Sequence, residues 1–372
     1  MLDHISYTQK VCLSITARKY VVFCRAHGIA MRCRCKTRNT RIFIFIFFLV
    51  GTFLIYKMLS QSDRNKDKVY VSRALTRDYV LTDISEKIEL KDSNDHTEVR
   101  RNNVNIFNQG RERTNLGFPF YKGLLKTPKG KKPIFLYSPD TDRMISSYVK
   151  DYQTWEESEL NKTAQLILKE KNATFIDLGC NVGVYSLYMA SLGVDIVAVD
   201  AVVDNLRLLS MSLKAAKTQS RSTLVHNAIS DKYETVIMKI PDDNRGGAHV
   251  ERVVDKNNAK VATKKSKKHI TVETITLDDL IPYVERTKVV IKMDIEGHEL
   301  NAITGAKTFF QTVNVRAILM EWTHYRSKES GKTLADILIK EGFLPYTSVP
   351  AEKVLDPEKF YTWPENVFWI KR

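Results

Sequence analysis

FIDLGCNVGVYSLYMA, the stretch at residues 175–190 of this 372-residue chain, predicts the central unit of the fold. A short apolar run ends at Asp177, and the turn D-x-G-x-N-x-G starts from that residue. The glycines of this turn let the backbone approach a ligand, and Gly183 also permits close packing where the next helix begins. The stretch therefore predicts a buried strand, a ligand-binding turn and a helix, in that order.

Three more apolar runs share this design, because each of them also leads into an acidic residue. Continuous apolar runs of this length are typical of strands buried on both faces of a parallel sheet, and helical patterns separate several of them. The sequence thus predicts an α/β fold with a doubly wound, mostly parallel sheet, which binds ligands at the carboxyl ends of its strands. The four acidic residues expected at that edge are Asp177, Asp200, Asp294 and Glu321.

Two of the helices carry start signals. Asp204 is placed to cap a helix with leucines on one face, and Thr333 with Asp336 resembles a capping box. Gly342 is the expected stop of the second helix.

The acidic edge distinguishes between two nucleoside cofactors. A dinucleotide would bring an anionic pyrophosphate beside Asp177, and the turn lacks the G-x-G-x-x-G spacing of dinucleotide sites. S-adenosylmethionine carries an ammonium and a sulfonium group, which carboxylates attract. Asp200 lies 21 residues beyond Gly179, where a carboxylate can accept the ribose hydroxyls of either cofactor. We therefore expect S-adenosylmethionine, with a NAD-dependent sugar oxidoreductase as the alternative.

Three segments resemble the FkbM-type methyltransferase family: residues 175–190, VETITLDDL at 272–280 and VVIKMDIEGHELNAITGA at 289–306. The resemblance runs from about Ile134 to the C-terminus. It implies a class I methyltransferase (Rossmann-like) sheet, S-adenosylmethionine as methyl donor and a hydroxyl group as acceptor. It also suggests that Trp155-Glu156 and the turn at 227–230 line the site. The cofactor-binding residues expected on these grounds are Asp177, Gly179, Asn181, Gly183, Asp200 and Asn227.

Catalysis needs a group that removes the acceptor proton, because an alcohol is a poor nucleophile. The candidates cluster behind the third acidic strand end, at Asp294, Glu296 and His298, with His324 as a further candidate behind Glu321. Asp294 suits a base or a ligand to a divalent metal, with Glu296 as a second oxygen ligand. No metal site is assigned, since no His/Cys cluster has zinc spacing.

Aromatic side chains near this edge have two interpretations. Stacking on a sugar is one, and the more common role in a hydrophobic core is the other. The residues concerned are Trp322, Tyr325, Trp363 and Trp369.

The N-terminal part predicts a membrane anchor. Residues 42–56 read IFIFIFFLVGTFLIY without a charge, and an apolar helix over 42–59 would span a thin bilayer core. Residues 1–41 hold nine Lys or Arg against one Asp, more than half of the chain's net charge of +15. That asymmetry favours a membrane anchor with a cytoplasmic N-terminus over a buried strand. A cleaved signal peptide is the other alternative, and it is disfavoured because no small-x-small site follows Tyr56. Met31 is an alternative start directly ahead of the anchor.

The expected organisation is a cytoplasmic basic tail at 1–41, a transmembrane signal anchor at 42–59, a stalk at 60–125 and a methyltransferase domain at 126–372. This topology predicts a single-pass type II protein of the Golgi or ER membrane, with a lumenal domain that methylates a glycan hydroxyl. Nucleic acid is not an expected partner, because the basicity lies mostly ahead of the anchor. A non-catalytic tethered recognition module is the second alternative. The role of the lysine tract at 256–268 is not predicted.

Overall fold

The computed structural model describes residues 21–26, 29–34, 89–93, 96–110, 116–242, 244–253, 269–284, 288–348 and 353–372. The predicted anchor at 42–59 and the lysine tract at 256–268 lie outside these residues. Among the described helices, none combines the length and apolarity needed to cross a membrane. The chain divides into two units, Met1–Thr82 and Asp83–Arg372. In the first unit, β1 (Val21–Ala26) and β2 (Ile29–Arg34) form an antiparallel hairpin.

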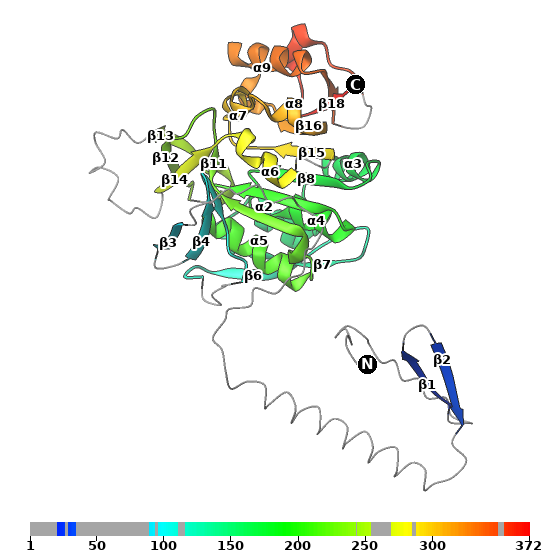
Figure 1. Ribbon diagram of the computed structural model, residues 1–372. Helices are drawn as coiled ribbons and strands as arrows, with labels where there is room; N and C mark the ends of the chain where they lie inside the picture. The colour runs from blue at the N-terminus through cyan, green and yellow to red at the C-terminus, as the bar shows by residue number, and fades with distance from the viewer. Residues whose placement is uncertain are drawn as a thin grey trace. The chain divides into compact units, whose positions relative to one another are not determined.

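A mixed sheet forms the centre of the second unit (Figure 1). Its five middle strands are parallel to their neighbours, and antiparallel strands extend it on both sides. The strands in spatial order are β17 (Phe343–Thr347), β18 (Asn366–Lys371), β16 (Asn314–Glu321), β15 (Lys288–Met293), β8 (Ala173–Leu178), β9 (Asp195–Asp200), β10 (Ser222–His226), β5 (Val104–Ile106), β4 (His96–Arg101) and β3 (Glu89–Ser93).

The chain reverses its direction of travel across the sheet between β8 and β15. From β8 it moves to β9 and β10 on one side, and later strands are added on the other side, beginning at β15. Such a switch point opens a crevice at the carboxyl ends of the strands, because the connections leave it in opposite directions. The ligand-binding position of the sheet is therefore the end of β8.

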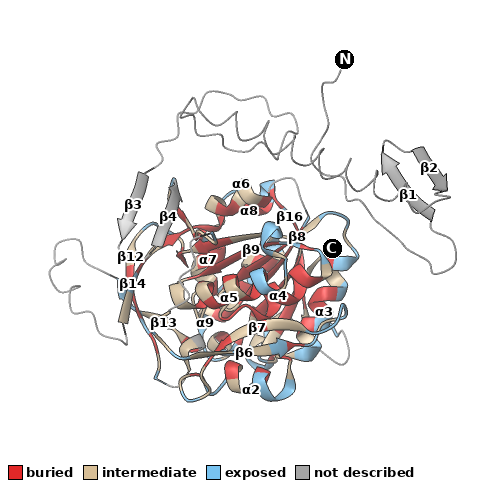
Figure 2. Ribbon diagram, turned by 90° about the horizontal axis from the view of Figure 1, so that it is seen from below, coloured by how far each residue is buried: buried red, intermediate tan, exposed pale blue. Residues whose placement is uncertain are grey.

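Helices cover both faces of the sheet, so successive strand residues enter two different cores. Ile176 and Leu178 belong to one core, and Phe175 belongs to the other. Figure 2 shows buried residues concentrated in the strands and in the helix sides that face them. The first core is covered by α6 (Ile281–Val284), α7 (Glu299–Gly305), α8 (Phe309–Thr312) and α9 (Glu329–Lys340), and the second by α2 (Ile145–Tyr152), α3 (Glu157–Leu168), α4 (Val184–Leu192) and α5 (Val203–Ala215). The predicted α/β fold with a mostly parallel sheet is confirmed.

Two smaller sheets complete the unit. One has the order β11 (Ala228–Ile229), β14 (His269–Ile275), β12 (Thr235–Lys239) and β13 (His249–Val253). The other is the antiparallel pair of β6 (Phe120–Leu125) and β7 (Lys132–Tyr137). Because β7 packs on α5 through the Phe135 N–H, which donates to Ser212 Oγ at 2.8 Å, this hairpin belongs to the main core.

The predicted boundary between stalk and domain at residue 125 is wrong. Val104 and Phe107 are only 3% and 5% exposed, and β5 pairs with β10 at the side of the main sheet. The polar residues around them hid this strand, because a strand of three residues gives too short an apolar run to detect. The folded domain therefore includes residues that were expected to be stalk.

Both predicted helix starts also need correction. The structure begins α9 at Glu329, so Thr333 lies inside the helix and its hydroxyl donates to the Glu329 carbonyl. In α5 no side chain caps the first turn, and Asp204 instead pairs with Arg207 and Arg245. Gly342 does follow α9 with a φ of +88°, in the left-handed region that the predicted stop requires.

Phe107 offers a test of the corrected boundary. We expect Phe107→Ala to lower the free energy of unfolding by about 3 to 5 kcal/mol, because it leaves a cavity in the core. Leu168→Ala is the matched control, since Leu168 is 59% exposed and its loss should cost no more than about 0.5 kcal/mol. Urea unfolding of the two variants measures the difference. Equal urea midpoints for the two variants would indicate that residues 104–107 belong to the stalk and not to the folded domain.

Candidate active site

A cavity of about 380 Å³ opens at the carboxyl ends of the parallel strands. It lies at the switch point, and its wall contains all four acidic residues that end the apolar runs: Asp177, Asp200, Asp294 and Glu321. These four side chains therefore lie together at one edge of the sheet, as the sequence predicted. Trp155, Glu156 and the start of the turn at Asn227 also line the cavity, as the family resemblance implies.

The glycine turn brings the backbone of β8 against the end of β15. Gly179 has a φ of +75°, and a Cβ atom there would collide with the carbonyl oxygen of Asp294. Gly183 has a φ of +85° and would collide with the Leu209 side chain, so it serves packing on α5 and does not line the cavity. Asn181, at a φ of +50°, lines the cavity between them, and its side-chain oxygen accepts from the Val182 N–H at 2.7 Å.

Asp177 and Asp200 both lie beside this turn, but they differ in their hydrogen-bond partners. One oxygen of Asp177 accepts from the Ser186 hydroxyl at 2.6 Å, while its Oδ1 is buried without a hydrogen-bond partner in the described residues. Asp200 accepts from the N–H groups of Asn181 at 2.7 Å and Val202 at 2.8 Å. Burial raises the pKa of both carboxyls, that of Asp200 to about 6.

Asn227 has a structural role as well as a place in the wall. Its Oδ1 accepts from the Asn105 N–H at 2.9 Å, and its Nδ2 donates to the Glu273 carbonyl at 3.1 Å. The residue thus ties β5 to β14 beside the cavity. The amide that faces Asp200 is Asn205, whose Nδ2 donates to Asp200 Oδ1 at 3.1 Å and which sequence reasoning missed.

Lys292 is the most important side chain that sequence reasoning missed. Its Nζ donates to Asp294 Oδ2 at 2.8 Å and lies 5.2 Å from the centre of the Tyr185 ring. Burial alone would lower the pKa of Lys292, but the surrounding carboxylates, Asp294 first, raise it above its usual value. The signal was a single lysine inside the apolar run VVIKMD, because a buried strand holds a charge only where it has partners.

Glu156 lines the cavity from the N-cap position of α3. Its backbone has a φ of +43°, which is unfavourable for a side chain of this size. The carboxylate accepts from the Tyr185 hydroxyl at 2.8 Å and from Asn366 Nδ2 at 3.2 Å. Burial raises the pKa of Glu156, and the positive charge of Lys292 opposes that effect. Strained backbone of this kind is frequent where a side chain has to be held in a site.

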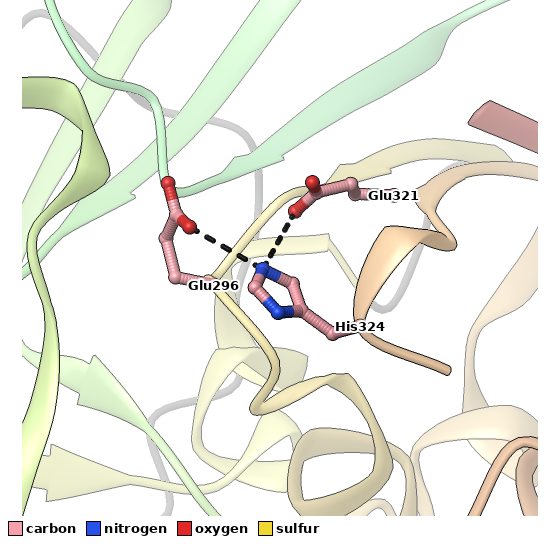
Figure 3. Close-up of side chains that lie close together, drawn as sticks. All are labelled: Glu296, Glu321 and His324. Atoms are coloured by element: carbon pink, nitrogen blue, oxygen red, sulfur yellow. Dashed lines mark ion pairs between the residues drawn. The ribbon is translucent and has the colours of Figure 1, made fainter. Parts of the chain in front are cut away.

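A histidine lies between two carboxylates at the end of β16 (Figure 3). His324 Nε2 is 3.4 Å from an oxygen of Glu296 and 3.6 Å from an oxygen of Glu321. Burial, followed by the nearby acidic residues, raises the pKa of Glu321 to about 8. Burial likewise raises the pKa of Glu296. These three residues can offer ligand atoms that all lie within 4.8 Å of one another, a spacing that suits one divalent cation.

The three residues predicted for catalysis all line the cavity but do not act as one group. Asp294 is bound to Lys292, and Glu296 approaches His324. His298 occupies the N-cap position of α7, outside the cluster of Glu296, Glu321 and His324. Burial lowers the pKa of His298. His324, expected only as a further candidate, is therefore the histidine that the structure places among the carboxylates.

The four aromatic residues considered for sugar stacking belong to the core instead. All are at most 2% exposed, and the Trp322 and Trp363 rings lie 4.8 Å apart. The Trp322 Nε1–H donates to the Phe360 carbonyl at 3.0 Å, so its polar atom is satisfied inside the protein.

The cavity suits a nucleoside that carries positive charge. The unpartnered Asp177 oxygen is a buried hydrogen-bond acceptor, which an ammonium group would satisfy. Gly179 lines the cavity with its backbone alone, because the position of a Cβ atom is taken by the Asp294 carbonyl oxygen. These features fit S-adenosylmethionine, and they would oppose an anionic pyrophosphate at the same position.

Among the comparisons with known proteins, one family model matches this chain. Residues 177–345 match the family described as the methyltransferase FkbM domain. No curated protein matches the sequence. A solved precorrin-6y C5,15-methyltransferase from Geobacter metallireducens is 12% identical, with a TM-score of 0.31 over 57% of this chain and 87% of that chain. An S-adenosylmethionine-dependent O-methyltransferase from Thermotoga maritima is 12% identical, with a TM-score of 0.30 over 67% and 77%.

Gly179 and Gly193 provide a matched test of the turn. Both have a positive φ, but a Cβ on Gly193 would meet nothing within 4 Å. Each alanine variant should lose about 1 to 2 kcal/mol of stability from its backbone alone. Gly179→Ala should in addition abolish S-adenosylmethionine binding, because the turn must move away from Asp294, whereas Gly193→Ala should bind normally. Calorimetric titration measures both, and normal binding by Gly179→Ala would contradict the assigned turn.

Proposed function

We propose that this chain, whose residues 177–345 match the FkbM methyltransferase domain, transfers a methyl group from S-adenosylmethionine to a hydroxyl group of a glycan. One observation supports a hydroxyl acceptor above all. The cavity that contains the cofactor turn also contains His324, placed between Glu296 and Glu321. A histidine held by carboxylates is the usual device for taking a proton from an alcohol.

Residues on the β8 and β9 side would hold the cofactor. Asp200 would accept the ribose hydroxyls, and Asp177 Oδ1 would accept the ammonium group. Gly179 and Asn181 would allow the backbone to follow the ligand closely. Asn227 would support this wall through its bonds to β5 and β14.

Residues on the β15 and β16 side would handle the acceptor proton. Bound S-adenosylmethionine would supply a sulfonium methyl group that an acceptor oxygen can attack, with a neutral thioether as the leaving group. His324 Nε2 would receive the hydroxyl proton, and Glu296 and Glu321 would stabilise the resulting imidazolium. Lys292 stays protonated, because its pKa is raised, and therefore would orient Asp294 without acting as a base.

The location that we propose for the chain would favour a glycan as the acceptor. The apolar stretch at 42–59 behind nine basic residues favours a type II anchor and a domain in the Golgi or ER lumen. Hydroxyl groups of glycans are abundant acceptors in that compartment. The alternative of a sugar oxidoreductase lacks its glycine spacing at 177–183, and a non-catalytic module would not need the His324 cluster.

His324→Asn tests the proposed base. We expect kcat to fall by about 10² to 10⁴, because the hydroxyl proton loses its acceptor while the cofactor wall is unchanged. Labelled methyl transfer to a glycan array measures activity, and calorimetry should show unchanged S-adenosylmethionine affinity. His269→Asn is the matched control, because His269 lies on β14 outside the cavity. Its Nε2 is 3.3 Å from an oxygen of Glu251, so it too is a histidine beside a carboxylate.

An unchanged kcat in His324→Asn would move the base to Asp294. Chelation distinguishes this role of the cluster from metal binding, because a proton acceptor needs no metal. Activity should survive dialysis against EDTA. Loss of activity that Mg²⁺ or Mn²⁺ restores would instead make Glu296, Glu321 and His324 the ligands of a cation.

Protease protection tests the proposed topology. In sealed microsomes the domain after residue 83 should resist added protease until detergent opens the membrane, because basic residues ahead of the anchor are retained in the cytoplasm. Replacing the five basic residues between 32 and 41 with glutamine should weaken this orientation. Digestion without detergent would place the domain in the cytosol and remove the reason for a lumenal glycan acceptor.

A further inference from the structure

An exposed row of large side chains runs along α2 toward the cavity. Met144, Tyr148 and Tyr152 follow one another at intervals of four residues, so they share one side of the helix. They are 53%, 42% and 57% exposed. The Tyr148 ring lies 4.5 Å from the Tyr152 ring and 5.4 Å from the Trp155 ring. We name these four residues the α2 ridge.

Trp155 packs against the core, but packing within the domain does not account for the other three residues of the ridge. The opposite side of α2 already supplies the contact with the core, through the buried Val149 and Ser146. Ser146 is fixed by Asp142, whose Oδ2 accepts from the Ser146 hydroxyl and N–H. Exposed apolar side chains that gather on one side of a helix mark an interaction surface more often than scattered ones do.

The ridge is continuous with the active-site cavity. Met144 at its start and Trp155 at its end both line the cavity, and so does Ile145 between them. The residue after Trp155 is Glu156, whose strained backbone and two hydrogen bonds fix this corner. A molecule that lies on the Tyr148 ring can therefore extend into the cavity without leaving the protein surface.

We propose that the α2 ridge binds the acceptor glycan, with Tyr148 and Tyr152 stacked on a sugar ring next to the one that is methylated. This inference rests on the proposed function. A pyranose has one face of C–H groups and an edge of hydroxyls, so it can use an aromatic surface and carboxylate acceptors together. The ridge supplies the aromatic surface, and Glu156, Glu296 and Glu321 supply acceptors within the cavity.

The charges of the cavity narrow the class of sugar. Acidic side chains in its wall outnumber its one lysine, Lys292, which is already bound to Asp294. An acidic sugar would meet repulsion from these groups at short range, so the acceptor is a neutral oligosaccharide. Tyrosine and tryptophan are also common at membrane surfaces, but continuity with the cavity favours the acceptor over lipid.

The test compares long and short acceptors. With neutral oligosaccharides as probes, Tyr148→Ala and Tyr152→Ala in the full chain should raise KM roughly tenfold, the loss of about one aromatic contact. Their kcat and S-adenosylmethionine affinity should not change. Tyr148→Phe should keep the wild-type KM, because stacking needs the ring and not the hydroxyl. With methyl monoglycosides, which cannot reach the ridge, all variants should behave alike.

Tyr361→Ala is the matched control, because Tyr361 is also 57% exposed and lies outside the cavity. An oligosaccharide KM that is equal in wild type and both alanine variants would overturn the ridge while leaving the proposed function intact. A different outcome is that the alanine variants bind neutral lipid vesicles more weakly than the wild type and keep the same KM. That result would assign the ridge to the membrane. Wild-type protein that binds S-adenosylmethionine but methylates no neutral sugar would overturn both proposals.

Discussion

The contact between the Gly179 turn and the end of β15 is the constraint on which the cavity depends. Backbone bonds fix it from both sides: the Gly179 N–H donates to the Val199 carbonyl, and the Asp294 N–H donates to the Leu178 carbonyl. Three strand ends are thereby held at one place, and each carries an acidic side chain. Only glycine allows this approach, because a Cβ would occupy the position of the Asp294 carbonyl oxygen.

The parts of this arrangement that lie in one strand and its turn could be predicted from the sequence. Buried parallel strands leave long apolar runs, and Asp177, Asp200, Asp294 and Glu321 end those runs. The strand at Val104–Ile106 left no such run, because it is only three residues long, and it joins the main sheet by pairing with β10. Local patterns detect a residue's own neighbours in sequence, and they carry no information about a partner 120 residues away.

The same reason explains which site residues were missed. The pairing of Lys292 with Asp294 is local, and an unusual charge within a strand could have revealed it. The approach of His324 to Glu296 joins two different loops, and no spacing in the sequence encodes it. Trp322 and Trp369 show the converse, since their sequence suited ligand stacking but their rings pack in the core. The type of each element could be predicted from the sequence, but which side chains from distant loops contact one another could not.

The carboxylates of the cavity explain why it should select a cationic ligand. Burial raises the pKa of Asp177, Asp200, Glu296 and Glu321, so ionising each of these carboxyls costs free energy. Lys292 offsets part of that cost on one side only. A sulfonium and an ammonium would offset more of it, and by linkage their binding should draw these carboxyls toward the ionised form. A pyrophosphate would increase the same cost, so the field of the pocket itself favours S-adenosylmethionine over a dinucleotide.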